Sequence, residues 1–197
     1  METLTANTQA HRDSVTEIEA QHAVRVLLQY IGEDPDREGL HDTPARFVRS
    51  LDELTSGYSL DPASILNTHF DSGGYDEMVV CRGIEFNSTC EHHMLPFQGV
   101  ACVGYIPKQR VVGLSKMARL VDCFARRLQI QEKMTHEIAT VMQGCLNPRG
   151  VGVVLRAKHL CMSCRGVRKP FAEMVTCSLT GVFRKPFVRA EFLAHCQ

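Results

Sequence analysis

The sequence predicts an α+β protein with an antiparallel sheet, helices on one face of that sheet, and an N-terminal helical region before it. Two observations support this prediction. Helical patterns dominate the first part of the chain, whereas the later part holds two pairs of strand-like runs separated by two helical patterns. Because strands that follow each other closely form hairpins, the sheet is expected to be antiparallel.

The N-terminal helical region is expected to span residues 14–70. Ser14-Val15-Thr16-Glu17 has the form of a capping box, and the apolar spacing that follows predicts a helix from about Ser14 to Ile31. Asp42-Thr43-Pro44 supplies a cap and an early proline for a second helix, ARFVRSLDELTSG. DPASIL adds a short helical turn. The preceding residues, 1–13, are expected to be disordered.

The catalytic domain is expected in residues 71–197. MVVCRGIEF and FQGVACVGYIP flank the segment CEHH as two strands, and GVGVVLRAKHLCM and AEMVTCSLTGVF form a second pair. Between the pairs, apolar stripes from Met117 to Leu128 and from Met134 to Cys145 predict two helices. PFVRAEFLAHC predicts a short last helix.

Composition limits the expected partners and location. The 197 residues carry a formal net charge of zero, so neither nucleic acid nor an anionic membrane is an expected partner. No apolar run approaches the ~20 residues that span a bilayer, and METLTANTQAHRD contains no signal-peptide core. The cytoplasm is therefore the expected location. There the nine cysteines should be mostly buried thiols or metal ligands rather than disulfides.

Residues that could hold a metal gather in two separate motifs. Cys90 and His93 have Cys-x-x-His spacing, which lets one tight turn aim both side chains at the same point. The segment HLCMSC offers the second half with His159, Cys161 and Cys164. Alone, each residue is more often a core thiol or a hydrogen-bonded histidine. Together, they favour a metal site.

Two kinds of zinc site fit these motifs. A closed structural site would use Cys164 as a fourth ligand, whereas an open site keeps a water in that position. Side chains alternate along a strand, so His159 and Cys161 would share a face while Cys164 would point away. The open site is favoured, with Cys90, His93 and Cys161 as ligands. Such a site lowers the pKa of its bound water toward ~7, and His92 and His159 are available for proton transfer.

A second group of residues could bind an anion. Ser115 is expected to cap the helix that follows, which would place backbone N–H groups and the positive dipole end there. Lys116 and Arg119 share the polar face, and Arg165 could complete a polyphosphate cradle. The ordinary alternative is a solvated polar face. Glu132 has a similar alternative, as a carboxylate favoured at a helix start.

The segments STCEHH, GLSKMARLVDCFARRLQIQE and HLCMSCRG, in this order and at these intervals, closely resemble the zinc-dependent type of the GTP cyclohydrolase I family. EDPDREGLHDTPAR also resembles the N-terminal helical region of that family, so the resemblance covers residues 17–192. It implies a tunnelling fold, in which antiparallel sheets of several subunits form barrels that stack as a homodecamer. Active sites at subunit interfaces are implied as well.

The resemblance also implies a role for each matching residue. Zinc is held by Cys90, His93 and Cys161. Acid–base catalysis falls to His92 and His159, and Ser115 acts near the ribose and phosphates. GTP is bound at its guanine by Glu132, in a pocket lined by Gln131, and at its triphosphate by Lys116, Arg119 and Arg165.

The implied reaction opens the imidazole ring of GTP by hydrolysis, releases formate, rearranges the ribose and cyclises to 7,8-dihydroneopterin triphosphate, the first step of folate and pterin biosynthesis. Glu132 would select guanine, because a carboxylate accepts hydrogen bonds from its N1–H and amino edge while adenine presents an acceptor at N1. Cys164 departs from the family pattern, in which an apolar residue is expected. It keeps a second hypothesis open: a catalytically silent tunnelling-fold protein with a four-ligand structural zinc.

Overall fold

The computed structural model describes residues 14–197. The segment predicted to be disordered, residues 1–13, lies outside the described residues. The chain divides into two compact units, one ending at Ser59 and one from Leu60 to Gln197. The sequence analysis placed this boundary after residue 70.

The first unit contains the predicted helices α2 (Glu17–Tyr30) and α3 (Thr43–Leu54), followed by the short 3-10 helix η1 (Ser56–Ser59). The capping box of α2 is formed by Thr16 and Glu19 and not by the predicted Ser14. The Thr16 hydroxyl accepts from the Glu19 backbone N–H at 3.2 Å, and the Glu19 carboxylate accepts from the Thr16 backbone N–H at 2.8 Å. A helix start two residues later than predicted satisfies both donors.

The second unit is an α+β domain, which confirms the predicted fold class. Its strands are β1 (His69–Asp71), β2 (Val79–Cys90), β3 (Pro96–Ile106), β4 (Arg110–Val112), β5 (Leu128–Gln129), β6 (Gly150–His159) and β7 (Met174–Leu179). Its helices are α4 (Pro62–Ile65), α5 (Leu114–Ala125), α6 (Gln131–Leu146), α7 (Leu160–Ser163), the 3-10 helix η2 (Gly181–Arg184) and α8 (Pro186–His195). Within residues 14–197, no helix is long and apolar enough to cross a membrane.

The main sheet has the strand order β5-β2-β3-β6-β7, and β1 pairs separately with β4. The long neighbours pair antiparallel, as predicted, and the two-residue β5 alone runs parallel to β2. Both predicted hairpins are therefore present. They occupy the centre and one edge of the sheet.

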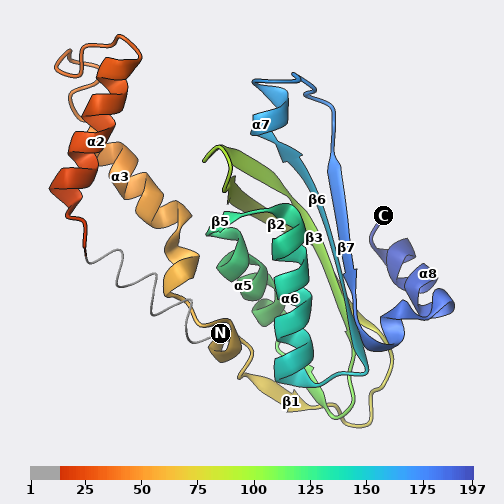
Figure 1. Ribbon diagram of the computed structural model, residues 1–197. Helices are drawn as coiled ribbons and strands as arrows, with labels where there is room; N and C mark the ends of the chain where they lie inside the picture. The colour runs from red at the N-terminus through yellow and green to blue at the C-terminus, as the bar shows by residue number, and fades with distance from the viewer. Residues whose placement is uncertain (1–13) are drawn as a thin grey trace. The chain divides into compact units, whose positions relative to one another are not determined.

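The two faces of the sheet carry different layers (Figure 1). Ala101 and Val103 of β3 belong to the main core, together with the apolar stripes of α5 and α6. Cys102, between them in sequence, belongs to a smaller cluster on the opposite face with Phe192 of α8. The alternation of side chains along β3 explains this division. The two long helices thus cover one face as predicted, and the short last helix, α8, lies on the other.

The two long helices begin at opposite ends of the sheet (Figure 1). α5 begins directly after β4 and ends just before β5, which pairs with the last residues of β2. α6 begins directly after β5 and runs back along the sheet. The 12 residues of α5 separate its ends by about 18 Å at ~1.5 Å per residue. The end where β2 and β6 stop therefore holds the start of α6 and not that of α5.

None of the nine cysteines forms a disulfide. Those that are buried are Cys90, Cys102 and Cys123, while the other six are half-buried or exposed. The nine cysteines were predicted to be mostly buried thiols or metal ligands rather than disulfides: no disulfide is present, but fewer cysteines are buried than predicted.

Candidate functional site

The loop between β2 and β3 brings Cys90 and His93 together. The backbone N–H of Cys90 donates to the Leu95 carbonyl at 2.9 Å, and that of Met94 donates to the Cys90 carbonyl at 2.8 Å. Met94 closes this turn in the left-handed region, with φ of 52°. A non-glycine residue rarely adopts such a backbone, and it persists here because two hydrogen bonds hold the turn around it.

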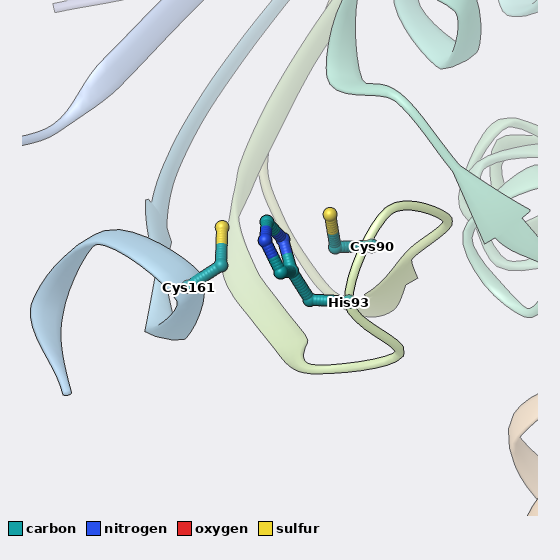
Figure 2. Close-up of side chains that lie close together, drawn as sticks. All are labelled: Cys90, His93 and Cys161. Atoms are coloured by element: carbon teal, nitrogen blue, oxygen red, sulfur yellow. The ribbon is translucent and has the colours of Figure 1, made fainter. Parts of the chain in front are cut away.

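Cys90, His93 and Cys161 form a group of possible metal ligands. Their donor atoms all lie within 4.8 Å of one another, and no other group of three or more such residues occurs in residues 14–197. Figure 2 shows the side chains side by side: Cys90 from the end of β2, His93 from the β2–β3 loop and Cys161 from α7. Cys90 is buried and His93 is exposed, so the group opens to solvent on one side. Two thiols and an imidazole are donors that suit zinc.

Cys161 lies in the short helix α7 and Cys164 is its C-cap, which corrects the reason given for separating them. β6 ends at His159, and α7 follows at once, so the expected strand alternation does not extend to Cys161. Cys164 is exposed, and its thiol donates to the Leu160 carbonyl at 3.0 Å, one helical turn back. It lies outside the group of three. The helical turn directs Cys164 away from the group, a result that was predicted on the wrong grounds.

The nearness of the two thiols affects the pKa of Cys161. Burial raises the pKa of the Cys161 thiol, and the adjacent Cys90 raises it further. A bound divalent cation would reverse this effect, because coordination deprotonates a thiol. Arg165 donates to Nε2 of His93 at 2.9 Å, and since arginine has no acceptor, this nitrogen presents its lone pair. A metal and Arg165 would compete for that lone pair.

His159 lies beside the group, at the end of β6. Its ring stacks on Phe97 of β3, with 4.5 Å between ring centroids and 4° between planes. Burial lowers the pKa of His159, and the Glu132 carboxylate acts in the opposite direction. Glu132 is exposed in the first turn of α6, close enough for its charge to act on the imidazole.

Gln131 fixes the orientation of His159. Its side-chain amide N–H₂ donates to the carbonyls of Leu155 and Met174 and to the Thr176 hydroxyl, at 3.1, 3.0 and 3.1 Å. Gln131 is 1% exposed. Because its nitrogen is committed to three acceptors, its oxygen must accept from Nε2 of His159, at 2.8 Å. In the neutral ring, Nδ1 is then left without the proton.

Sequence reasoning placed Gln131 in the wall of the substrate pocket and missed this network. The available signal was Thr135, four residues later on the same helix face, whose hydroxyl lies 2.6 Å from that of Thr176. Thr176 itself is on β7, and nothing in its local sequence points to His159. Phe97 was also missed, since an apolar strand residue has no distinctive signal.

His92 lies beside the group of three, whereas the predicted site residues of α5 lie far from it. His92 is exposed, and its Nδ1 lies 4.0 Å from Sγ of Cys90, so it borders the group of three. Ser115, Lys116 and Arg119 lie in the first turns of α5, at the opposite end of the sheet. Ser115 does not cap that helix: the N-cap is Gly113, and no side chain caps it. One chain thus does not bring all the predicted site residues together.

Known proteins match almost the whole chain. The sequence profile of GTP cyclohydrolase I matches residues 20–197. A GTP cyclohydrolase 1 from Wolinella succinogenes is 53% identical over 179 residues, which cover 90% of this chain and 96% of that protein. The protein of the same name from Streptomyces griseus is 51% identical over 177 residues, which cover 89% and 88%. That from Chlorobium chlorochromatii is 49% identical over 188 residues, which cover 95% and 84%.

Among solved structures, an archaeosine synthase QueF-like protein in its apo form matches with a TM-score of 0.44 and 17% identity. The match covers 53% of this chain and 93% of that one. Nothing about the site follows from so distant a likeness. The sequence matches are much stronger evidence, because the relatives are about 50% identical to this chain over nearly its whole length. They show that the chain belongs to the GTP cyclohydrolase I family.

Proposed function

We propose that the chain is a zinc-dependent GTP cyclohydrolase I, which converts GTP to 7,8-dihydroneopterin triphosphate with release of formate. The family supports the reaction. The observation that carries the assignment of the site is the group Cys90, His93 and Cys161, with a fixed histidine and an exposed carboxylate beside it. This combination offers a metal site, a proton carrier and an anchor for a base.

Cys90, His93 and Cys161 would hold the zinc ion. Three protein ligands leave a fourth position open, as in catalytic zinc sites. Bound there, zinc would supply hydroxide at neutral pH for attack on the imidazole ring. Nine cysteines without a disulfide agree with a reducing, cytoplasmic location, where thiol ligands stay available.

Glu132 would bind the guanine. It is exposed in the first turn of α6, and its carboxylate can accept hydrogen bonds from the N1–H and the amino group of guanine. Because its charge also acts on His159, the base and the imidazole would lie close together. Adenine would place an acceptor against the same carboxylate, so Glu132 would also discriminate between the two purines.

Since Gln131 occupies Nε2, Nδ1 of His159 would take up a proton and pass it to the purine. Stacking on Phe97 and the bond to Gln131 hold the ring in one orientation, so no reorganisation is needed when a proton moves. We therefore assign Gln131 a positioning role. His92, beside Cys90, is the second acid–base candidate.

The triphosphate site would need two chains. Arg165 lies at the metal end, whereas Ser115, Lys116 and Arg119 lie at the far end of α5. A second copy of the chain would supply these three residues to complete each site. The domain has the tunnelling fold of the family, and the homodecamer associated with that fold would provide such interfaces.

A GTP turnover assay tests the activity. Zinc-loaded protein is incubated with GTP, with and without a chelator, and oxidised neopterin is read by fluorescence. We expect neopterin in the first case and its loss in the second. Folded, zinc-loaded protein without neopterin would instead favour a structural zinc, in which Cys164 joins as a third sulfur. X-ray absorption separates the two, since the enzyme requires two sulfurs and one nitrogen.

A complementation experiment tests the shared site. Lys116→Ala and Cys161→Ala would each be inactive alone, because one lacks a triphosphate contact and the other the metal. After mixing, dissociation and reassembly, some interfaces combine the intact half of each variant, so activity should return. A mixture of Cys161→Ala with Cys90→Ala is the matched control and should stay inactive, because both changes damage the same half. Absence of recovery in the first mixture would contradict the shared site.

A further inference from the structure

Cys102 and Cys196 form a second pair of thiols, away from the metal group. Cys102 lies in β3 and is 5% exposed, while Cys196 directly follows α8. The two are 94 residues apart in sequence, yet their Sγ atoms are 2.6 Å apart. This distance is only slightly longer than an S–S bond of ~2.05 Å. Neither residue belongs to the metal group in the described part of the chain.

The packing of α8 holds this pair in place. Phe192 lies over two glycines, Gly104 of β3 and Gly152 of β6, and its ring meets Phe183 edge-on with 5.1 Å between centroids. A Cβ on either glycine would come within 2.8 Å of the Phe192 ring. The glycines therefore let α8 approach the sheet closely enough for Cys196 to contact Cys102.

A cavity leads to the two thiols. It has a volume of about 290 Å³ and is lined by Cys102 and Cys196 together with Arg82, Arg156 and His195. Nε of Arg156 is buried and has no hydrogen-bond partner. A small molecule can therefore reach the sulfur atoms in a surrounding rich in positive charge.

The pKa values of the two thiols are shifted in opposite directions. The Cys196 thiol donates to Sγ of Cys102 and, with Arg82 and Arg156, lowers the pKa of Cys102. The same hydrogen bond raises the pKa of Cys196 well above its usual range, and burial adds to this. Since the thiolate is the nucleophile, Cys102 is the thiol that attacks first.

We propose that Cys102 and Cys196 form a reversible redox pair, oxidised by a low-molecular-weight disulfide such as oxidised glutathione, whose disulfide form ties α8 to the sheet. The Cys102 thiolate attacks one sulfur of the disulfide and expels a thiolate, which takes up the proton that Cys102 released on ionising. A mixed disulfide stays on Cys102. The Cys196 sulfur then attacks Sγ of Cys102, its proton goes to the departing small thiolate, and the second small thiol leaves. Two protein thiols are oxidised, and one small disulfide is reduced to two thiols.

Mass spectrometry of the zinc-loaded protein tests the pair directly. After graded exposure to oxidised glutathione, non-reducing peptide mapping should show one cross-link, between the peptides of Cys102 and Cys196. In Cys196→Ser the glutathione adduct should persist on Cys102, because the resolving thiol is gone. In Cys145→Ser, which removes an exposed thiol elsewhere, the cross-link should form as in the parent protein.

Two further measurements separate this mechanism from chance oxidation. Cys102 in the Cys196→Ser protein should capture glutathione at least about 10-fold faster than Cys145 does. Oxidation should also slow amide exchange in α8 of the parent protein and leave it unchanged in Cys196→Ser. A cross-link of Cys196 to Cys177, no cross-link at all, or equal rates at Cys102 and Cys145 would overturn the proposal.

Discussion

The molecule contains two cysteine pairs built in a similar way but with different neighbours. Each joins a cysteine of the β2–β3 hairpin to one carried by a later helical segment: Cys90 with Cys161 of α7, and Cys102 with Cys196 after α8. The first pair has His93 within 4.8 Å. The second has two arginines along its cavity, and His195, which also lines that cavity, forms no group of possible metal ligands with the two thiols in residues 14–197.

From this difference we infer that the third neighbour decides what two close thiols can do. An imidazole adds a ligand and an open side for a cation, which favours metal binding. Arginines repel a cation and stabilise a thiolate, which favours redox chemistry. The two faces of one sheet thus support two chemistries from the same residue type. The predictions below test this contrast.

The largest effect is expected from Cys161→Ala. The metal group would lose one of three ligands, so both bound metal and ring opening should disappear. Activity should fall by far more than the ~10- to 100-fold that loss of a supporting residue costs. Metal content by elemental analysis and neopterin fluorescence measure the two effects. Cys102→Ala, in the other pair, is the matched control and should keep its metal; retained metal in Cys161→Ala would remove Cys161 from the site.

Metal removal should make both cysteine pairs sensitive to oxidised glutathione. With zinc bound, oxidised glutathione should cross-link Cys102 to Cys196 and leave Cys90 and Cys161 intact, because coordination protects those thiolates. After chelation, Cys90 and Cys161 should also oxidise. Activity should then return only if a reductant accompanies added zinc. Full recovery with zinc alone, after oxidant treatment of the chelated protein, would contradict this prediction.

Glu132→Gln should weaken GTP binding while zinc is retained. The change removes the negative charge of the acceptor and leaves a side chain of the same shape. Hydrogen bonds to charged groups contribute about 1.5–3 kcal/mol, so the Kd for GTP should rise about 10- to 150-fold. Calorimetry on zinc-loaded protein measures this. Glu91→Gln, another exposed carboxylate near the loop, is the control, and equal binding by both variants would remove Glu132 from its anchoring role.

Gln131→Leu should slow turnover about 10-fold without loss of zinc, since supporting residues around metal sites typically have effects of this size. The direct readout is the ¹⁵N chemical shift of His159, which reports which ring nitrogen carries the proton. The parent protein should show the proton on Nε2, and the variant a mixture. Thr176→Val removes one of the three acceptors and should leave the His159 signal unchanged. An unchanged signal in Gln131→Leu would refute the positioning role.

Local patterns predicted most of the fold because the periodicity of each element matches its environment. The alternation of Ala101, Cys102 and Val103 separates two layers, and the stripes of α5 and α6 face the main core. Cys90, His93 and Cys161 were predicted as metal ligands from their spacing, and the structure brings their donor atoms within 4.8 Å of one another; their binding of a metal stays a prediction. These features depend on residues that are close together in the sequence, so the sequence alone is enough to predict them.

The errors occur where non-local contacts or very short elements decide the structure. α7 has four residues, too few to show helical periodicity, so it was read as a continued strand. Ser115 was predicted to be the N-cap of α5, but Gly113 holds that position, two residues earlier, and no side chain caps the helix. Gln131 is held by Met174 and Thr176, more than 40 residues away. No local pattern reports such contacts.

The smallest effect is expected from Cys164→Met, and it decides between catalytic and structural zinc. Cys164 is exposed and bonded to the Leu160 carbonyl, outside the metal group, so its replacement should change neither metal content nor turnover. If the closed site were correct, the variant would lose a sulfur ligand and bind zinc more weakly. X-ray absorption of parent and variant should show the same two sulfurs in both. A drop from three sulfurs to two would move Cys164 into the site, and the open coordination position on which the proposed reaction depends would no longer exist.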